Sequence, residues 1–389
     1  MRPIESTGLW VFRRLARVGT IALTLPVGRT VPVGRGDPVA DVTFADYGVV
    51  GEILRQGLTG FAEAYMDQRV ETTDLGALLR WGASNQASWF EHPAARIMLP
   101  VRRLWQRIRP ERRHRRVRSM NDHYNLGNDF YGSWLDETMT YSSARFAAPS
   151  QPLADAQRNK YRIIADHIGL EQGMRVLEIG CGWGGFAEYA ATERGCDVVA
   201  ITLSDQQAGY AGKRIAEAGI ADRVDIRVQD FREVDGRFDA VVSIEMIESI
   251  DETQWPGLFG KIATSLEPGA RAVMQIITTT DGDWERYRSR ADFIQQYIFP
   301  GGQLPAPKIV RQMSRAAGLA VEQVETFGLD YARTLAHWRR RFDAAWPRLR
   351  ERHDLDERFR RMWDLYLALC EEGFRIGRIG VEQWVFARG

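Results

Sequence analysis

The chain has 389 residues, which is long enough for two domains that each bury a core of their own. Its hydrophobic share of 44%, charged share of 26% and 12 tryptophans exclude a disordered protein. A net charge of +1 excludes a general attraction to nucleic acid or membrane, so any such attraction must be local.

Cysteine spacing and the N-terminal sequence bear on the compartment. Cys181, Cys196 and Cys370 form no CxxC pair and no metal-binding spacing, which indicates a reducing environment. The apolar stretch that ends at Pro26 is too short to span a bilayer, and no clean cleavage site follows it. These features predict a cytoplasmic protein without a transmembrane helix.

Residues 1–101 mix short β-like segments with helical patterns, and we predict a smaller N-terminal α+β accessory domain there. An arginine-rich run with nine arginines and no lysine follows from Arg102 to Arg118, so residues 102–120 are interpreted as a linker. The run either is a solvated surface or binds anionic phospholipid headgroups, where each cation contributes about 1 kcal/mol. Nucleic-acid binding is not expected, because no recognised reading module accompanies the charge.

From about residue 170 onward, strand-like and helix-like segments alternate, which predicts a parallel sheet with crossover helices within a catalytic domain at 121–389. The segments predicted as strands are 174–180, 197–203, 224–230, 238–245, 270–278, 320–327 and 383–389. Long inserts rich in aromatic residues and arginine separate Thr278 from Gly318 and Asp330 from Gly380. A doubly wound sheet builds its binding site from such inserts at the carboxyl ends of strands.

Gly180, Gly182 and Gly185 fit the pattern G-x-G-x-x-G between a predicted strand and a predicted helix, where glycine permits close backbone approach to a cofactor. A Walker A loop is excluded, because no Lys-Ser or Lys-Thr follows. A nicotinamide dinucleotide would require an acid at the tip of the second strand, which reads ITLS at 201–204. The acid lies instead before the loop, at Glu178. This predicts S-adenosylmethionine (SAM), which carries an ammonium and a sulfonium but no phosphate.

The glycine loop and several further motifs resemble the cyclopropane-fatty-acid synthase family, which includes the mycolic acid cyclopropane synthases. Those motifs are GFAEAYMDQRVETTDLGALL (60–79), HYNLGNDFYGSWLDETMTYSSARF (123–146), ITLSDQQAGYA (201–211), QYIFPGGQLP (296–305) and FGLDYARTLAHW (327–338). The resemblance implies an α/β, Rossmann-like SAM-dependent methyltransferase with seven strands, the last antiparallel, and helical inserts that cover a lipid site. It implies that SAM donates a methyl group to a cis double bond in a phospholipid acyl chain and leaves as S-adenosylhomocysteine (SAH). The acyl cation then loses a proton from the added methyl group and closes a cyclopropane ring.

The resemblance also implies which residues bind SAM. It places Tyr141 and Ser142 over the methionine end, Gly180 and Gly182 below it, Thr202 and Gln207 near the ribose, and Asp230 and Phe231 near the adenine. Thr202 and Gln207 have an alternative interpretation as a helix N-cap and a surface amide. No metal is expected, because His123 has no second histidine at metal spacing.

A bound bicarbonate is the proton acceptor that the resemblance implies, held by a Cys, a Glu, a His, a Tyr and a backbone group. Glu248 matches the glutamate, Tyr331 the tyrosine and Ile277 the backbone position, whereas Ser143 replaces the cysteine and Gln275 the histidine. Ser and Gln form hydrogen bonds with anions but lack the charge of a histidine. Either bicarbonate still binds, or Glu248 or a water takes the proton, or the cation follows another route.

The role of Glu245 and the final product each allow more than one interpretation. Glu245, in the same turn as Glu248, is interpreted either as an added charge in the site or, with a slight preference, as a solvent-facing carboxylate. The enzyme could instead form methyl-branched or desaturated methylated chains, as in furan fatty acid formation, or the protein could be a non-catalytic SAM- or lipid-binding partner. The expected partners are a membrane phospholipid with an unsaturated chain and the anionic inner membrane surface, which the protein would contact peripherally. The sequence does not decide whether the protein forms a homodimer.

Aromatic residues in the inserts are expected either to pack in the core or to line an apolar tunnel for the acyl chain, where a π face could steady the transient cation. They are Tyr297, Phe299, Trp338, Phe342 and Trp346.

Overall fold

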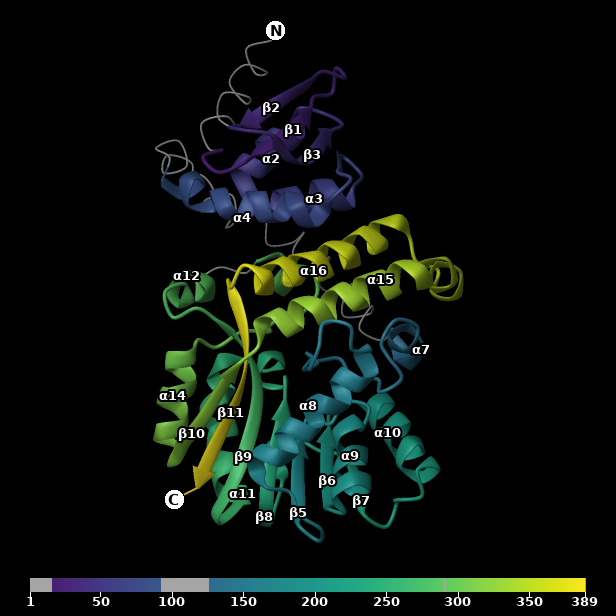
Figure 1. Ribbon diagram of the computed structural model, residues 1–389, viewed down its shortest axis with the longest axis vertical. Coiled ribbons are helices and arrows are strands. Elements are labelled where there is room, and N and C mark those ends of the chain that lie inside the picture. Colours follow the sequence, from purple (N-terminus) through teal and green to yellow (C-terminus); the bar gives the residue numbers. More distant parts are fainter. Residues whose placement is uncertain (1–15, 92–125, 290–291, 389) are drawn as a thin grey trace. The chain divides into compact units, whose positions relative to one another are not determined.

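The computed structural model describes residues 16–91, 126–289 and 292–388 (Figure 1). The chain divides into two compact units. The second unit comprises 126–290, 301–345 and 373–389, and the first comprises the remaining segments. The predicted limits at 101 and 120 lie outside the described residues, so this division and the linker remain predictions.

The first unit contains a four-stranded sheet in the order β2-β1-β3-β4. Its strands are β1 (Thr20–Thr24), β2 (Thr30–Gly34), β3 (Pro38–Phe44) and β4 (Val70–Glu71). Its helices are α2 (Gly48–Gln56), α3 (Leu58–Met66), α4 (Leu75–Glu91) and α13 (Phe293–Tyr297), together with parts of α15 (Gly328–His353) and α16 (Glu357–Arg375). Alternate residues such as Ile21 and Leu23 are buried, which is the period expected of a strand with one covered face.

Residues 346–372 belong to the first unit because Arg361 anchors them to it. Its guanidinium lies 4.1 Å from the ring centroid of Tyr65, donates to the carbonyl oxygens of Tyr65 (2.5 Å) and Val70 (2.6 Å), and forms an ion pair with Glu71 (2.8 Å). This buried cation therefore joins segments that are far apart in the sequence.

The second unit contains a seven-stranded sheet in the order β10-β11-β9-β8-β5-β6-β7. Its strands are β5 (Arg175–Ile179), β6 (Asp197–Thr202), β7 (Val224–Val228), β8 (Phe238–Ile244), β9 (Leu266–Thr279), β10 (Leu319–Thr326) and β11 (Ile379–Arg388). All seven predicted strands are confirmed. The pairs from β7 to β9 are parallel, and β11 runs antiparallel to both β9 and β10, which confirms the reversed last strand.

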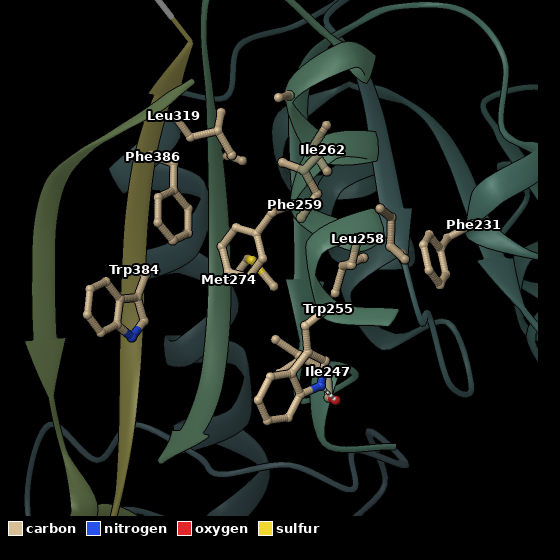
Figure 2. Packing of buried hydrophobic residues seen from close by; sticks show 14 of the residues in the cluster. Phe231, Ile247, Trp255, Leu258, Phe259, Ile262, Met274, Leu319, Trp384 and Phe386 are labelled. Atoms are coloured by element: carbon tan, nitrogen blue, oxygen red, sulfur yellow. Dashed lines mark hydrogen bonds between the residues drawn. The ribbon is translucent and has the colours of Figure 1, made fainter. Parts of the chain in front are cut away.

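Helices cover both faces of this sheet (Figure 1). One face packs against α8 (Leu153–Ile168), α9 (Gly185–Arg194) and α10 (Asp205–Glu217), and the other against α11 (Trp255–Ser265) and α14 (Pro307–Ala316). Figure 2 shows the core under α11, where Phe259 meets Phe386 of β11 edge to face at 5.8 Å. Such aromatic burial contributes about 25 cal/mol per Å² of apolar surface. The sheet is thereby a rigid base for the residues at its carboxyl edge.

The second unit also contains the short helices α7 (Gly127–Gly132) and α12 (Trp284–Arg288) and the short 3-10 segments η2 (Phe231–Glu233), η3 (Ile247–Ser249) and η4 (Glu252–Gln254). Among the described residues, no helix combines the length and the apolar character needed to cross a membrane.

Candidate active site

The glycine loop lies between β5 and α9. The N–H groups of Gly180 and Cys181 both donate to the carbonyl oxygen of Ile201, at 3.0 and 2.9 Å, which ties the loop to β6. Gly180 has φ +86°, and an added Cβ would lie 2.7 Å from Cγ of Met246, so only glycine fits there. At Gly182 an added Cβ would meet no described atom within 4 Å. The open space beside Gly182 is where a ligand can approach the backbone.

Glu178 lies in β5, just before the glycine loop, and is only 2% exposed. Its Oε2 has no hydrogen-bond partner among the described residues. Burial raises the pKa of its carboxyl to about 8, against the lowering effects of the Ala187 N–H and of the Lys160 and Arg214 charges. A buried carboxylate with an unpartnered oxygen suits a cationic ligand. The loop and Glu178 together fit SAM.

Thr202 and Gln207 lie next to one another beside the loop. Thr202 ends β6, and its hydroxyl donates to Oε1 of Gln207 at 2.7 Å. The N-cap of α10 is Ser204, so Thr202 is not the cap that its alternative interpretation required.

Asp230 and Phe231 follow the end of β7. Asp230 caps η2 and forms an ion pair with Arg232 (2.6 Å), while the Phe231 ring packs in the core shown in Figure 2. The predicted SAM residues at and after the ends of β6 and β7 thus share the carboxyl edge of the sheet with the glycine loop, where such sheets bind ligands.

Tyr141 and Ser142 are held by aromatic packing and by α8. The Tyr141 ring lies 5.2 Å from Trp338 and 5.6 Å from Trp134, centroid to centroid. The Ser142 hydroxyl accepts a hydrogen bond from Nζ of Lys160 at 2.6 Å, and its carbonyl accepts one from Nε2 of Gln157 at 2.9 Å. This segment is therefore fixed on both sides.

Lys160 is a fully buried cation that the sequence analysis did not identify. Burial lowers its pKa to about 7, although the nearby carboxylates of Glu245, Asp136 and Glu178 oppose that change. A signal was present in the sequence, because Lys160 falls at helical spacing on a stripe that the structure buries. That stripe comprises Leu153, Gln157, Lys160, Ile164 and Ile168.

Glu245 is the centre of a cluster that also contains Ser143, Gln275 and Tyr331, which we call the carboxylate cluster. Its Oε1 accepts hydrogen bonds from the Ser143 N–H (2.9 Å) and from Nε2 of Gln275 (2.7 Å), and its Oε2 accepts one from the Tyr331 hydroxyl (2.6 Å). The prediction of a solvent-facing Glu245 carboxylate is therefore wrong: the left-handed turn after β8 directs it inward. Because these donors already bind Glu245, the described residues do not fit an additional bicarbonate at this place.

Glu248 lies in η3 and contacts a different partner. Its Oε1 accepts a hydrogen bond from the Ile277 N–H at 2.5 Å, and its buried Oε2 has no hydrogen-bond partner among the described residues. Burial and the negative charge of Glu245 raise the pKa of Glu248 to about 8. The structure thus brings Glu248 to Ile277, and gathers Ser143, Gln275 and Tyr331 around Glu245 instead.

Tyr331 is enclosed by two further rings. It stacks on Phe374 (centroids 4.3 Å apart) and meets Trp338 edge to face (6.0 Å). Phe374 also lines a pocket of about 440 Å³ at the carboxyl end of β9, a volume typical of ligand sites. Further lining residues are Thr278, Thr279, Thr280, Leu329, Ile379 and Glu382. The stacked rings of Phe374 and Tyr331 thus connect the lining of this pocket to the Glu245 carboxylate.

The aromatic residues of the inserts are distributed over both units, and all except the half-buried Phe299 are buried. Trp338 and Phe342 belong to the second unit, and both are at most 1% exposed. Tyr297, Phe299 and Trp346 belong to the first unit, where Tyr297 stacks on Phe293. Trp338 packs directly on the site, because its ring contacts those of Tyr141 and Tyr331.

A parallel sheet with one reversed strand, a glycine loop after β5 and a buried acid beside that loop define the class of Rossmann-like SAM-dependent methyltransferases. Comparison with known families shows to which family of these methyltransferases the chain belongs. The family model described as mycolic acid cyclopropane synthetase matches residues 111–384, and the chain belongs to this family.

Two relatives illustrate the similarity in sequence. The tuberculostearic acid methyltransferase of Mycobacterium tuberculosis is 37% identical over 353 residues, which cover 86% of this chain and 80% of that protein. The cyclopropane-fatty-acyl-phospholipid synthase of Escherichia coli (strain K12) is 33% identical over 367 residues, covering 93% and 92% of the two chains.

Solved structures agree with this assignment. A cyclopropane synthase from Mycobacterium tuberculosis is 28% identical, with a TM-score of 0.64 over 68% of this chain and 95% of that one. A mycolic acid cyclopropane synthase complexed with SAH and CTAB is also 28% identical, with a TM-score of 0.64 over 69% and 97%. The protein is thus a SAM-dependent methyltransferase that acts on lipid acyl chains, as the resemblance predicted.

Proposed function

We propose that the enzyme transfers the methyl group of SAM to the double bond of an unsaturated acyl chain in a membrane phospholipid. The observation that carries this proposal is the pair of enclosed carboxylates, Glu245 and Glu248, at the same sheet edge as the glycine loop. The phospholipid substrate is supported by the similarity to the synthase of Escherichia coli, which is named for it.

SAM supplies an electrophilic methyl group when it is bound. In our proposal Gly180 and Gly182 let the backbone approach it, and Glu178 faces its positive charge. Tyr141 and Ser142 cover its methionine end, and the remaining SAM-binding assignments stand as the resemblance implied them: Thr202 and Gln207 near the ribose, Asp230 and Phe231 near the adenine.

The alkene gains the methyl group and becomes a cation, so the site must exclude water and must accept a proton. Tyr141 and Trp338 present aromatic rings that keep water out, and their π faces stabilise positive charge. A proton then leaves the added methyl carbon for an enclosed carboxylate, and the electron pair of the broken C–H bond closes the ring.

Methyl transfer without ring closure is the second candidate. Ser143 and Gln275 depart from the family pattern at the site where the proton is removed, and the 37% identical relative is named for methyl transfer rather than for cyclopropane formation. A methylated chain that keeps a double bond would then be the product, and a saturated methyl-branched chain would require a hydride donor in addition.

Deuterium labelling separates the candidates. Cells that express the enzyme are fed methionine with a trideuterated methyl group, and their phospholipid acyl chains are analysed by mass spectrometry. Ring closure expels one deuteron and leaves a ring CD₂ group, whereas loss of a proton from the chain itself retains CD₃ on a methylated alkene. Cells that express Gly182→Val serve as the control without SAM binding. Unlabelled lipid would contradict methyl transfer, and an additional double bond without label would favour a desaturating enzyme.

A further inference from the structure

We infer that Glu245 occupies the place of an external bicarbonate, so that the chain carries its own proton acceptor. This inference rests on the proposed function, because it assigns the group that removes the proton after methyl transfer.

The hydrogen-bond donors support this assignment. Ser143, Gln275 and Tyr331 are three of the positions that the family resemblance assigned to bicarbonate, and all three donate to the Glu245 carboxylate at 2.6–2.9 Å. A carboxylate presents a planar pair of oxygens, as bicarbonate does. Since both oxygens of Glu245 are engaged, a bicarbonate would have to compete for the same donors.

Charge balance points the same way. The ionisable groups that act on Glu245 and its neighbour Glu248 are the Lys160 ammonium, the Tyr331 hydroxyl and the two carboxyls themselves. Burial and this like charge already raise the pKa of Glu248. A further anion would add negative charge beside two carboxyls whose pKa values burial already raises, which a site of low dielectric disfavours.

Backbone strain gives a third, independent observation. Glu245 has φ +50°, in the left-handed region where a side chain other than glycine costs about 1–2 kcal/mol. Strain of this kind persists where a side chain is needed in one place. A glycine at this position would relieve the strain and remove the carboxylate at the same time.

The step then balances within the chain. The C–H bond of the added methyl group breaks, its proton binds a Glu245 oxygen, and its electron pair forms the new C–C bond. The acyl cation and the ionised Glu245 both become neutral. Tyr331 and Gln275 hold the carboxylate in position while it receives the proton.

The experiment compares bicarbonate binding by the full-length wild-type enzyme and two variants in carbonate-free buffer. Sodium bicarbonate labelled with ¹³C is added, and binding is followed by NMR line broadening and by melting temperature. Glu245→Gly suits the left-handed backbone and frees the donors, so it should bind bicarbonate. The wild type should not. Glu267→Gly, at an exposed residue of β9 that makes no hydrogen bond to Ser143, Gln275 or Tyr331, is the matched control and should not respond.

Turnover gives the second readout. Labelled methyl transfer by the wild type should not depend on bicarbonate, and bicarbonate should raise the turnover of Glu245→Gly at least tenfold. Glu245→Gln keeps the shape but accepts no proton, so it should lose about 10²- to 10⁴-fold without rescue by bicarbonate.

Stoichiometric binding of bicarbonate by the wild type, a severalfold acceleration of its turnover, or full turnover of Glu245→Gln would overturn the inference. If no form of the protein methylates lipid, the proposed function fails. Bicarbonate binding by Glu245→Gly but not by the wild type would still support the assignment of Glu245. Should Glu245→Gly not fold, the wild type and Glu245→Gln decide the question.

Discussion

Tyr331→Phe tests the geometry of the carboxylate cluster with a change of one atom. The phenolic oxygen lies 2.6 Å from Oε2 of Glu245, while the ring packs on Phe374 and Trp338. Removal of the hydroxyl leaves the ring contacts in place. The variant therefore isolates the hydrogen bond from the packing.

A hydrogen bond to a charged group contributes about 1.5–3 kcal/mol, which corresponds to roughly 10- to 150-fold in rate. The Tyr331 hydroxyl stabilises the ionised form of Glu245 and so lowers its pKa against the raising effect of burial. Without the hydroxyl this pKa rises further. A base acts only above its pKa, so the variant should lose turnover earlier as the pH falls and approach the wild type at high pH.

The assay is the pH dependence of single-turnover methyl transfer to vesicles of a cis-unsaturated phospholipid, with SAM affinity measured by calorimetry. We expect the acidic limb of the profile to move to higher pH at unchanged SAM affinity. Tyr287→Phe is the matched control, because the hydroxyl that it removes accepts a hydrogen bond from the Leu304 N–H instead of donating to a carboxylate of the cluster. Superimposable profiles for Tyr331→Phe and the wild type would refute the role of the hydrogen bond.

Three further predictions concern binding. Gly182→Val should abolish SAM binding in calorimetry by filling the open space at the loop, and a folded variant with wild-type affinity would contradict this. Because the pKa of Glu178 is raised to about 8 and its ionised form suits a cation, SAM affinity should weaken as the pH falls below 8, and this component of the pH dependence should vanish in Glu178→Gln. Replacing four arginines of the arginine-rich run with Gln should weaken binding to anionic vesicles, most clearly at low salt. SAM affinity should not change. Unchanged vesicle binding would mean that the run is only a linker. These arginines, which lie outside the described residues, are Arg112, Arg113, Arg115 and Arg116.

The fold was predictable from local patterns for reasons that particular segments illustrate. Apolar runs such as 238–245 and 270–278 correspond to β8 and to the carboxyl-terminal part of β9, because strands that are covered on both faces are continuously apolar. The reversed direction of β11 has no local signature, and it came from the family resemblance. The attachment of residues 346–372 to the first unit depends on contacts of Arg361 with segments nearly 300 residues away in the sequence, which no local pattern reports.

The sequence analysis grouped three residues that the structure brings together, but it did not give their arrangement. Ser143, Gln275 and Tyr331 were identified together, yet the carboxylate among them is Glu245 rather than Glu248. The sequence does not specify that a glutamate adopts a left-handed φ, since that conformation is rare for a side-chain-bearing residue. The turn geometry therefore decides which of two buried acids accepts the hydrogen bonds of Ser143, Gln275 and Tyr331.

Lys160 donates a hydrogen bond to Ser142, and its charge acts on Glu178 and Glu245. The variant Lys160→Met separates the cost of the buried charge in folding stability from its contribution to turnover. The lowering of its pKa from 10.5 to about 7 means that the buried charge costs about 5 kcal/mol near neutral pH. Its hydrogen bond to Ser142 stabilises the fold by about 1.5–3 kcal/mol, which is less than the cost of burying the charge. We therefore expect the melting temperature of the variant at pH 7 to equal or exceed that of the wild type.

The pH dependence of Lys160→Met follows from the same comparison. The unfolded chain binds the proton of Lys160 between pH 7 and 10.5 and the folded chain does not, so this residue makes wild-type stability rise across that window. The variant should lack that rise. Its turnover should fall, because Glu245 loses the cation that favours its ionised form, and the acidic limb should move to higher pH. A destabilised variant with a wild-type pH profile would mean that Lys160 only supports the fold. A stable variant with the shifted profile would mean that the buried cation is retained for the charge state of Glu245.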